Sequence, residues 1–152
     1  MHSAQSHIDV PISSWRRVWA ASDNVRTAFN YVQTGAYAMS RDLLLLLEPG
    51  FADPRYPGER FICPDGAPIE GLLASDPARV ARLDVRHVPF ERPRQAVVAA
   101  LDDAHQGLPV LVLGDDQPAP ADAQTLGERR FVTDTRRILD LLAERHGFPK
   151  VH

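Results

Sequence analysis

Apolar residues along the chain gather in short runs, separated by stretches rich in proline, glycine and charged residues. The clearest run is Leu43-Leu44-Leu45-Leu46-Leu47, which is followed directly by Glu48-Pro49-Gly50. Because this run is short, unbroken and ended by a turn signal, it predicts a strand that is buried on both faces. Residues 83–90, 108–113 and 129–132 are also rich in apolar residues and predict three further strands.

Three segments between and after these strands carry a helical pattern. The first begins near Pro68, and Ile69, Leu72 and Leu73 form its apolar face. The second spans residues 93–105 and ends at Gly107, and the third spans residues 134–146 and ends at Gly147. Residues 49–62 and 115–127 are rich in proline, glycine, alanine or aspartate, and they predict long loops.

The order of these elements predicts an α/β fold over residues 39–152. A strand, a helix and a second strand form a βαβ unit, whose strands should be parallel. The last two strands are joined by a loop without a helix, which predicts that they are antiparallel. We therefore expect one mixed sheet of four strands, βαβ followed by αββα, with helices on both faces.

Residues 1–38 form an extension to this domain, in which residues 14–32 predict an amphipathic helix. One interpretation is that this helix docks on a partner or closes a homodimer; the other is that it packs on its own domain or is loosely held. Met39 directly precedes the first strand, so either Met1 or Met39 is a candidate start. No basic, then apolar, signal-peptide pattern is visible, and together with the single cysteine this predicts a cytoplasmic protein.

Composition excludes several classes of function. The chain has 152 residues, 44% of them apolar, and its formal net charge of −3 argues against a nucleic-acid partner. Its longest apolar run is too short to cross a bilayer. The single cysteine excludes an internal disulfide and a multi-cysteine metal site, and the histidines form no ligand pair, so we expect no metal and no bound cofactor.

One segment carries candidate chemistry: Cys63-Pro64, at the start of the first helix. The unpaired amides and the positive dipole of a helix start favour a thiolate, and Arg60 would add to this effect. Asp65 would oppose it by like charge. Cys63 is therefore either a reactive thiol or an ordinary small apolar residue at a junction between a loop and a helix.

This order of elements resembles the thioredoxin-like fold, in the variety found in glutaredoxins and in the N-terminal domain of glutathione transferases. Three segments carry the resemblance: Cys63-Pro64, Leu108-Pro109 at the start of the third strand, and Val132-Thr133-Asp134 before the last helix. The resemblance implies a reactive cysteine at the first segment and a cis proline at the second. It implies that the third segment holds the γ-glutamyl end of glutathione.

Within that superfamily, the chain resembles a bacterial family of uncharacterised proteins, domain of unknown function 3088. The matching text is LLLLLEPGFADPRYPGERFICPDG, followed by IEGLLAS, RPRQAVV and LPVLVL, and it extends over most of residues 40–150. This family implies the thioredoxin-like fold but supplies no activity.

The sequence thus leads to two functional hypotheses. In the first, the protein is a glutathione-linked oxidoreductase with Cys63 as its single nucleophilic thiol, because Gly66 stands where a dithiol enzyme has its second cysteine. Leu108 and Pro109 would clamp the substrate backbone, with glutathione or a thiol-bearing protein as partner. In the second, the domain is a redox-inert binding module.

The remaining site residues have a structural alternative in each case. Pro109 would be a trans proline that opens a strand. Thr133 and Asp134 would cap the last helix rather than bind the amino group of glutathione.

Overall fold

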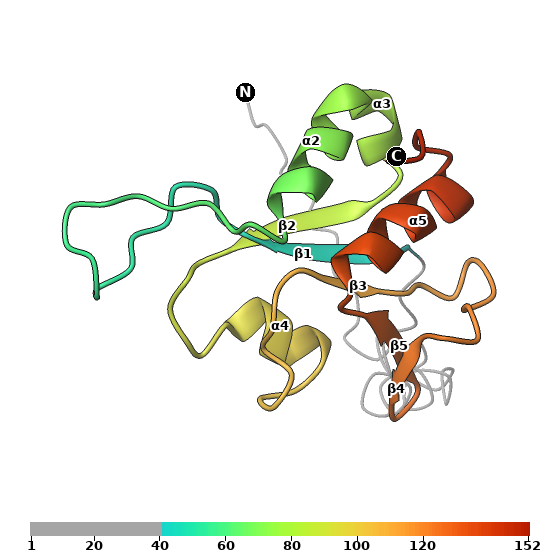
Figure 1. Ribbon diagram of the computed structural model, residues 1–152. Coiled ribbons are helices and arrows are strands. Elements are labelled where there is room, and N and C mark those ends of the chain that lie inside the picture. The colour runs from blue at the N-terminus through green and yellow to red at the C-terminus, as the bar shows by residue number, and fades with distance from the viewer. Residues whose placement is uncertain (1–40) are drawn as a thin grey trace, which may run out of the picture. The chain divides into compact units, whose positions relative to one another are not determined.

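The computed structural model describes residues 41–152, which form a mixed α/β domain (Figure 1). The helix expected over residues 14–32, and with it the expected dimer contact, lies outside the described residues. The elements in chain order are β1 (Leu43–Leu47), α2 (Ala67–Ser75), α3 (Pro77–Val80), β2 (Asp84–Val88), α4 (Gln95–Ala100), β3 (Val110–Val112), β4 (Gln124–Leu126), β5 (Arg129–Val132) and α5 (Thr135–His146).

All the strands belong to one sheet, in the order β2-β1-β3-β5-β4. β1 and β2 are parallel, which confirms the βαβ unit, and β3 is antiparallel to β5, as expected. The structure adds that β3 is also antiparallel to β1, a pairing that we did not predict from the sequence. The expected number of strands was wrong, because residues 124–126 form an additional edge strand in a segment that we interpreted as loop. This strand is short and mostly exposed, so it lacks the apolar pattern that marks the central strands.

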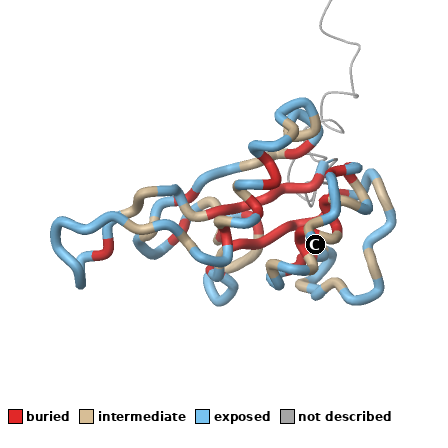
Figure 2. The backbone as a smooth tube through the Cα atoms, turned by 45° about the horizontal axis from the view of Figure 1, so that its top comes forward, coloured by how far each residue is buried: buried red, intermediate tan, exposed pale blue. Residues whose placement is uncertain are grey.

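Both faces of the sheet are covered, as the run of five leucines predicts. Leu44 and Leu46 belong to the same core cluster as apolar residues of α2 and α5. Leu43 and Leu45 point the other way and belong to a second cluster with residues of α4. Figure 2 shows the buried backbone concentrated in the central strands and in the helices beside them.

The second helix is much shorter than residues 93–105 and ends at Ala100. The carboxylate of Asp102 accepts hydrogen bonds from the amides of Ala104 and His105, and the Gln106 side chain donates to the carbonyl of Asp103. These local hydrogen bonds from side chains satisfy backbone amides and carbonyls in a turn. They therefore compete with the hydrogen bonds that would continue the helix. Residues 101–109 instead form an irregular connection that leads to β3.

The last helix has the ends that its sequence predicts. The Asp134 side chain accepts a hydrogen bond from the amide of Arg137 at 2.7 Å, which identifies Asp134 as the N-cap. Gly147 ends the helix in the left-handed conformation, at φ 73°, and its amide donates to the carbonyl of Ala143.

Candidate functional site

The three segments singled out in the sequence meet at one end of the sheet. Leu45 of β1 pairs with Val110 of β3, so continuing this antiparallel ladder brings Pro109 and Leu108 to the carboxyl end of β1. Leu111 pairs with Val132, so Thr133 and Asp134 leave β5 at this same end. The loop that carries Cys63 also departs from the carboxyl end of β1 and returns to α2 there (Figure 1).

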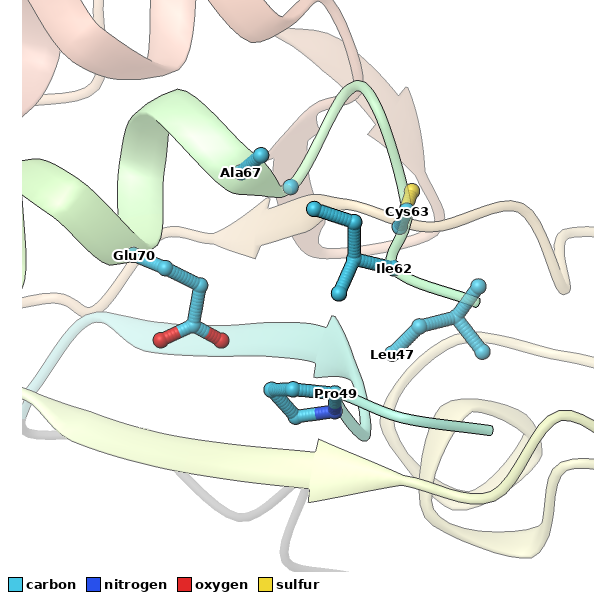
Figure 3. Close-up of a pocket in the computed structure, with 7 residues that line it drawn as sticks. Leu47, Pro49, Ile62, Cys63, Ala67 and Glu70 are labelled. Atoms are coloured by element: carbon cyan, nitrogen blue, oxygen red, sulfur yellow. The ribbon is translucent and has the colours of Figure 1, made fainter. Parts of the chain in front are cut away.

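Cys63 lies at the head of α2, beside a small open pocket (Figure 3). Its carbonyl accepts a hydrogen bond from the amide of Ala67 at 2.9 Å, and its side chain is partly exposed. The volume of the pocket is about 210 Å³. Its walls are mainly apolar and come from the end of β1, the loop and the first turns of α2: Leu47, Pro49, Ile62, Cys63, Gly66, Ala67 and Glu70.

Gly66 borders the sulfur of Cys63. A Cβ atom on Gly66 would stand 3.8 Å from Cys63 Sγ, at ordinary contact distance. The N-cap of α2 is Gly66 itself, so no side chain caps this helix start. Pro64 is exposed and is not among the residues that line the pocket.

A hydrogen-bonded pair of side chains marks the far side of the pocket from the sulfur. The Glu70 carboxylate points toward the sheet (Figure 3), where Oε1 lies 2.7 Å from Nε2 of His87 on β2. Both side chains are partly exposed, with 33% and 42% of their surfaces accessible. Glu70 therefore already has a partner, although it borders the same pocket as Cys63.

The bond between Leu108 and Pro109 is cis, as the resemblance implies, so the trans alternative is wrong. A second cis bond joins Arg92 and Pro93. Pro109 is buried, and Leu108 packs against the core cluster on the α4 side of the sheet.

The two residues before α5 have different local roles. Asp134 caps the helix, as described above, whereas Thr133 does not: its Oγ1 accepts a hydrogen bond from the Gln124 side chain on β4 at 3.0 Å. The next residue, Thr135, donates from Oγ1 to the carbonyl of Asp65 at 3.2 Å. This bond ties the start of α5 to the loop that carries Cys63.

Sequence reasoning missed a buried arginine next to this end of the sheet. Arg94 is only 8% exposed, although it stands in a polar stretch that we interpreted as the start of a helix. Its Nη1 donates to the carbonyl of Gln106 at 2.6 Å, and its Nη2 donates to the carbonyl of Phe90 at 2.9 Å. No local pattern marks this residue, because its side chain is buried by contacts with the carbonyls of two loop residues, which lie four positions before it and 12 positions after it.

A second charged cluster lies at the opposite, amino end of β1. Asp42 is fully buried, and its carboxylate accepts hydrogen bonds from Arg145, from His146 and from the amide of Gly114. The arrangement joins α5 to the start of β1 and to the segment after β3, so its role is in holding the fold together. Among residues 41–152, no group of histidine, cysteine and carboxylate side chains is arranged to hold a metal ion.

Comparison with known proteins identifies the family of the chain but no activity. No helix in the described part of the chain is both long and apolar enough to cross a membrane. No curated protein and no solved structure matches the chain. A protein family described as "protein of unknown function (DUF3088)" matches residues 41–150, which is most of the chain. The chain therefore belongs to the DUF3088 family.

Proposed function

We propose that this domain is thioredoxin-like and acts as a single-thiol, glutathione-linked oxidoreductase, with Cys63 as its nucleophile. The observation that carries the proposal is the position of Cys63, partly exposed in an open pocket at the head of α2. Leu108-Pro109 and Thr133-Asp134 leave the sheet at the same end. A thiol in this position is open to attack a disulfide, and it lies beside the positive end of the α2 dipole.

The chemistry requires one disulfide substrate and one external thiol. The Cys63 thiolate attacks the glutathione sulfur of a mixed disulfide between glutathione and a substrate protein, so that a Cys63–glutathione disulfide forms and the thiolate of the substrate protein leaves. A reduced glutathione thiolate then attacks the glutathione sulfur of the Cys63–glutathione disulfide, releasing the Cys63 thiolate and oxidised glutathione. Gly66 provides no second thiol, so resolution must come from outside the chain. Such a cycle suits the reducing cytoplasm, where we place the protein.

The direct test is formation of the mixed disulfide. The folded protein is treated with oxidised glutathione at about pH 8.5, where half of an ordinary free thiol is ionised, and the adduct is followed by intact mass spectrometry. The same chain in denaturant provides the rate for an unstructured Cys63. We expect the folded protein to react faster than the denatured chain. A Cys63 that stays unmodified in the folded protein, but reacts when unfolded, would contradict the proposal.

The alternative is a redox-inert binding module, and one observation favours it. Ile62 and Tyr56, on the loop between β1 and α2, expose 64% and 50% of their surfaces, and Ile62 also lines the pocket. Exposed apolar side chains beside an apolar pocket suit a partner contact. Comparing Cys63→Ser with Ile62→Ser in cells separates the two functions: loss of the phenotype only with Ile62→Ser, at unchanged stability, indicates binding without redox chemistry.

A further inference from the structure

Arg94 carries a charge that is buried and incompletely paired. Two of its guanidinium nitrogens donate to loop carbonyls, but Nε is buried without any hydrogen-bond partner. No carboxylate forms an ion pair with Arg94 among the described residues. A buried cation without a counter-ion is costly, and an anion that reached Arg94 would offset this cost.

A continuous set of contacts leads from Arg94 to the Cys63 loop. Arg94 donates to the carbonyl of Phe90 and lies 6.0 Å from the centre of its ring. The ring of Phe90 stacks on Phe51, at 4.7 Å between centroids and 3° between planes. Phe51 in turn pairs through its backbone with Phe61, two positions before Cys63. The guanidinium therefore belongs to the same structural unit as the thiol.

Electrostatics supports this placement. Burial lowers the pKa of Arg94, and the positive charge of Arg92 lowers it further, whereas a negative charge on Cys63 raises it. This interaction between the charges of Arg94 and Cys63 agrees with the contacts that join the two residues. The nearest acidic side chain in the pocket, Glu70, already interacts with His87. Arg94, in contrast, has no carboxylate partner among the described residues and is less exposed than Glu70, so water screens its charge less.

Space for an anionic group exists next to Arg94. An open cavity of about 520 Å³ lies between the loop that joins β1 to α2 and the segment that follows β2. Its lining residues are Pro54, Phe90, Glu91, Arg92 and Arg94. Two arginines and one glutamate give it a net positive lining at neutral pH.

We propose that Arg94 makes the Cys63 site selective for disulfides that carry a negative charge near the reacting sulfur, such as peptides with a free carboxylate. This inference rests on the proposed function and names its substrate class: anionic rather than neutral or cationic disulfides. Arg94 acts here as a specificity-determining residue whose charge attracts the substrate. Its hydrogen bonds also hold the segment that leads to Leu108.

The test compares two reagents that alkylate Cys63 and differ mainly in charge. Iodoacetate is an anion and iodoacetamide is neutral, and each rate is divided by the rate for the same chain in denaturant. The ratio of the two normalised rates reports the potential at the sulfur and needs no disulfide chemistry. We expect the anion to be favoured, and Arg94→Gln to lower the ratio about fivefold, which corresponds to about 1 kcal/mol of interaction between two unit charges.

Three controls make the result specific. Arg94→Lys keeps the charge and should keep most of the ratio, and Arg82→Gln removes an exposed arginine near the opposite end of β2 and should leave it unchanged. For the wild-type protein, added salt should bring the ratio toward one. If Arg94→Gln does not fold, the salt dependence of the wild-type ratio still tests the proposal.

The outcomes separate the two proposals. An unchanged ratio in folded Arg94→Gln, or a wild-type ratio that salt does not alter, overturns the role of Arg94. If the ratio behaves as expected but oxidised glutathione forms no adduct with Cys63, then the charge selectivity stands and the redox function fails.

Discussion

Asp42 and His146 stand 104 positions apart in the chain, yet His146 Nε2 lies 2.8 Å from Asp42 Oδ2. Arg145 contacts the same carboxylate through both Nε and Nη2, at 2.7 and 2.8 Å. The residue before β1 and the end of α5 are thus joined by a buried ionic cluster. This cluster fixes the amino end of the central strand, while the opposite end of that strand supports the proposed site.

The first prediction concerns the stability of this cluster against acid. Burial raises the pKa of Asp42, but hydrogen bonds from His146, Arg145 and the Gly114 amide outweigh it and lower the pKa to about 2. The pKa of Asp42 in the folded protein lies below the ordinary value of about 3.9. The ionised carboxylate therefore contributes its full stabilisation of the fold at pH values above this ordinary pKa. This stabilisation is lost as the pH falls through about 4 to 2, and it amounts to about 2.5 kcal/mol.

Urea unfolding at several pH values measures this loss. Asp42→Asn should cost about 3–5 kcal/mol at neutral pH, because it removes the buried counter-ion of Arg145. The remaining carboxylate partner, Asp116, is 3.7 Å away and 41% exposed, so it compensates little. The variant should also lack this part of the acid dependence. If its free energy of unfolding falls as steeply as that of the wild type between pH values of about 4 and 2, other carboxylates are responsible.

The second prediction uses two glycines in different backbone conformations. Gly147 has φ 73°, and an added Cβ would stand 2.6 Å from Arg79 Nη1. Gly147→Ala should therefore destabilise the protein by about 1–2 kcal/mol. Gly71, within α2, is the matched control, because its added Cβ meets nothing within 4 Å. Gly71→Ala should stabilise by about 0.5–1 kcal/mol in chemical denaturation, so equal effects of the two changes would refute this interpretation.

The third prediction separates capping by Asp134 from ligand binding. Asp134→Ala removes the acceptor for the Arg137 amide and should cost about 1 kcal/mol in chemical denaturation. Asp134→Asn keeps a capping oxygen but loses the negative charge, so stability should change little. If Asp134 also binds the amino group of glutathione, the asparagine variant should form the Cys63 adduct more slowly. An unchanged rate would limit Asp134 to its role as a cap.

The fourth prediction concerns Gln106, which holds the segment before β3. Its side-chain oxygen accepts a hydrogen bond from the Arg94 amide at 2.7 Å, and the residue is only 7% exposed. Gln106→Leu leaves that buried amide without a partner and should cost about 1–3 kcal/mol. Amide hydrogen exchange should show weaker protection at Arg94. Gln95→Ala, an exposed change in the same region, should alter stability by less than about 0.5 kcal/mol and serves as the control.

The sequence by itself determined the elements whose signals are local. Five consecutive leucines required a strand covered on both faces, and Asp134 and Gly147 marked the two ends of α5. In each case the deciding interaction lies within a few residues or follows from the two-residue repeat of a strand. The βαβ order likewise fixed the parallel pairing of β1 with β2.

Only the tertiary structure decided the pairings between distant polar groups. The edge strand β4 depends on the neighbouring β5, because its own residues are mostly exposed. Asp42 and Arg94 look like ordinary surface charges in the sequence, and they are buried because backbone amides and carbonyls from other segments surround them. The free energy of a buried charge depends on partners that only the folding of the chain brings together. The spacing of residues along the sequence does not show which partners these are.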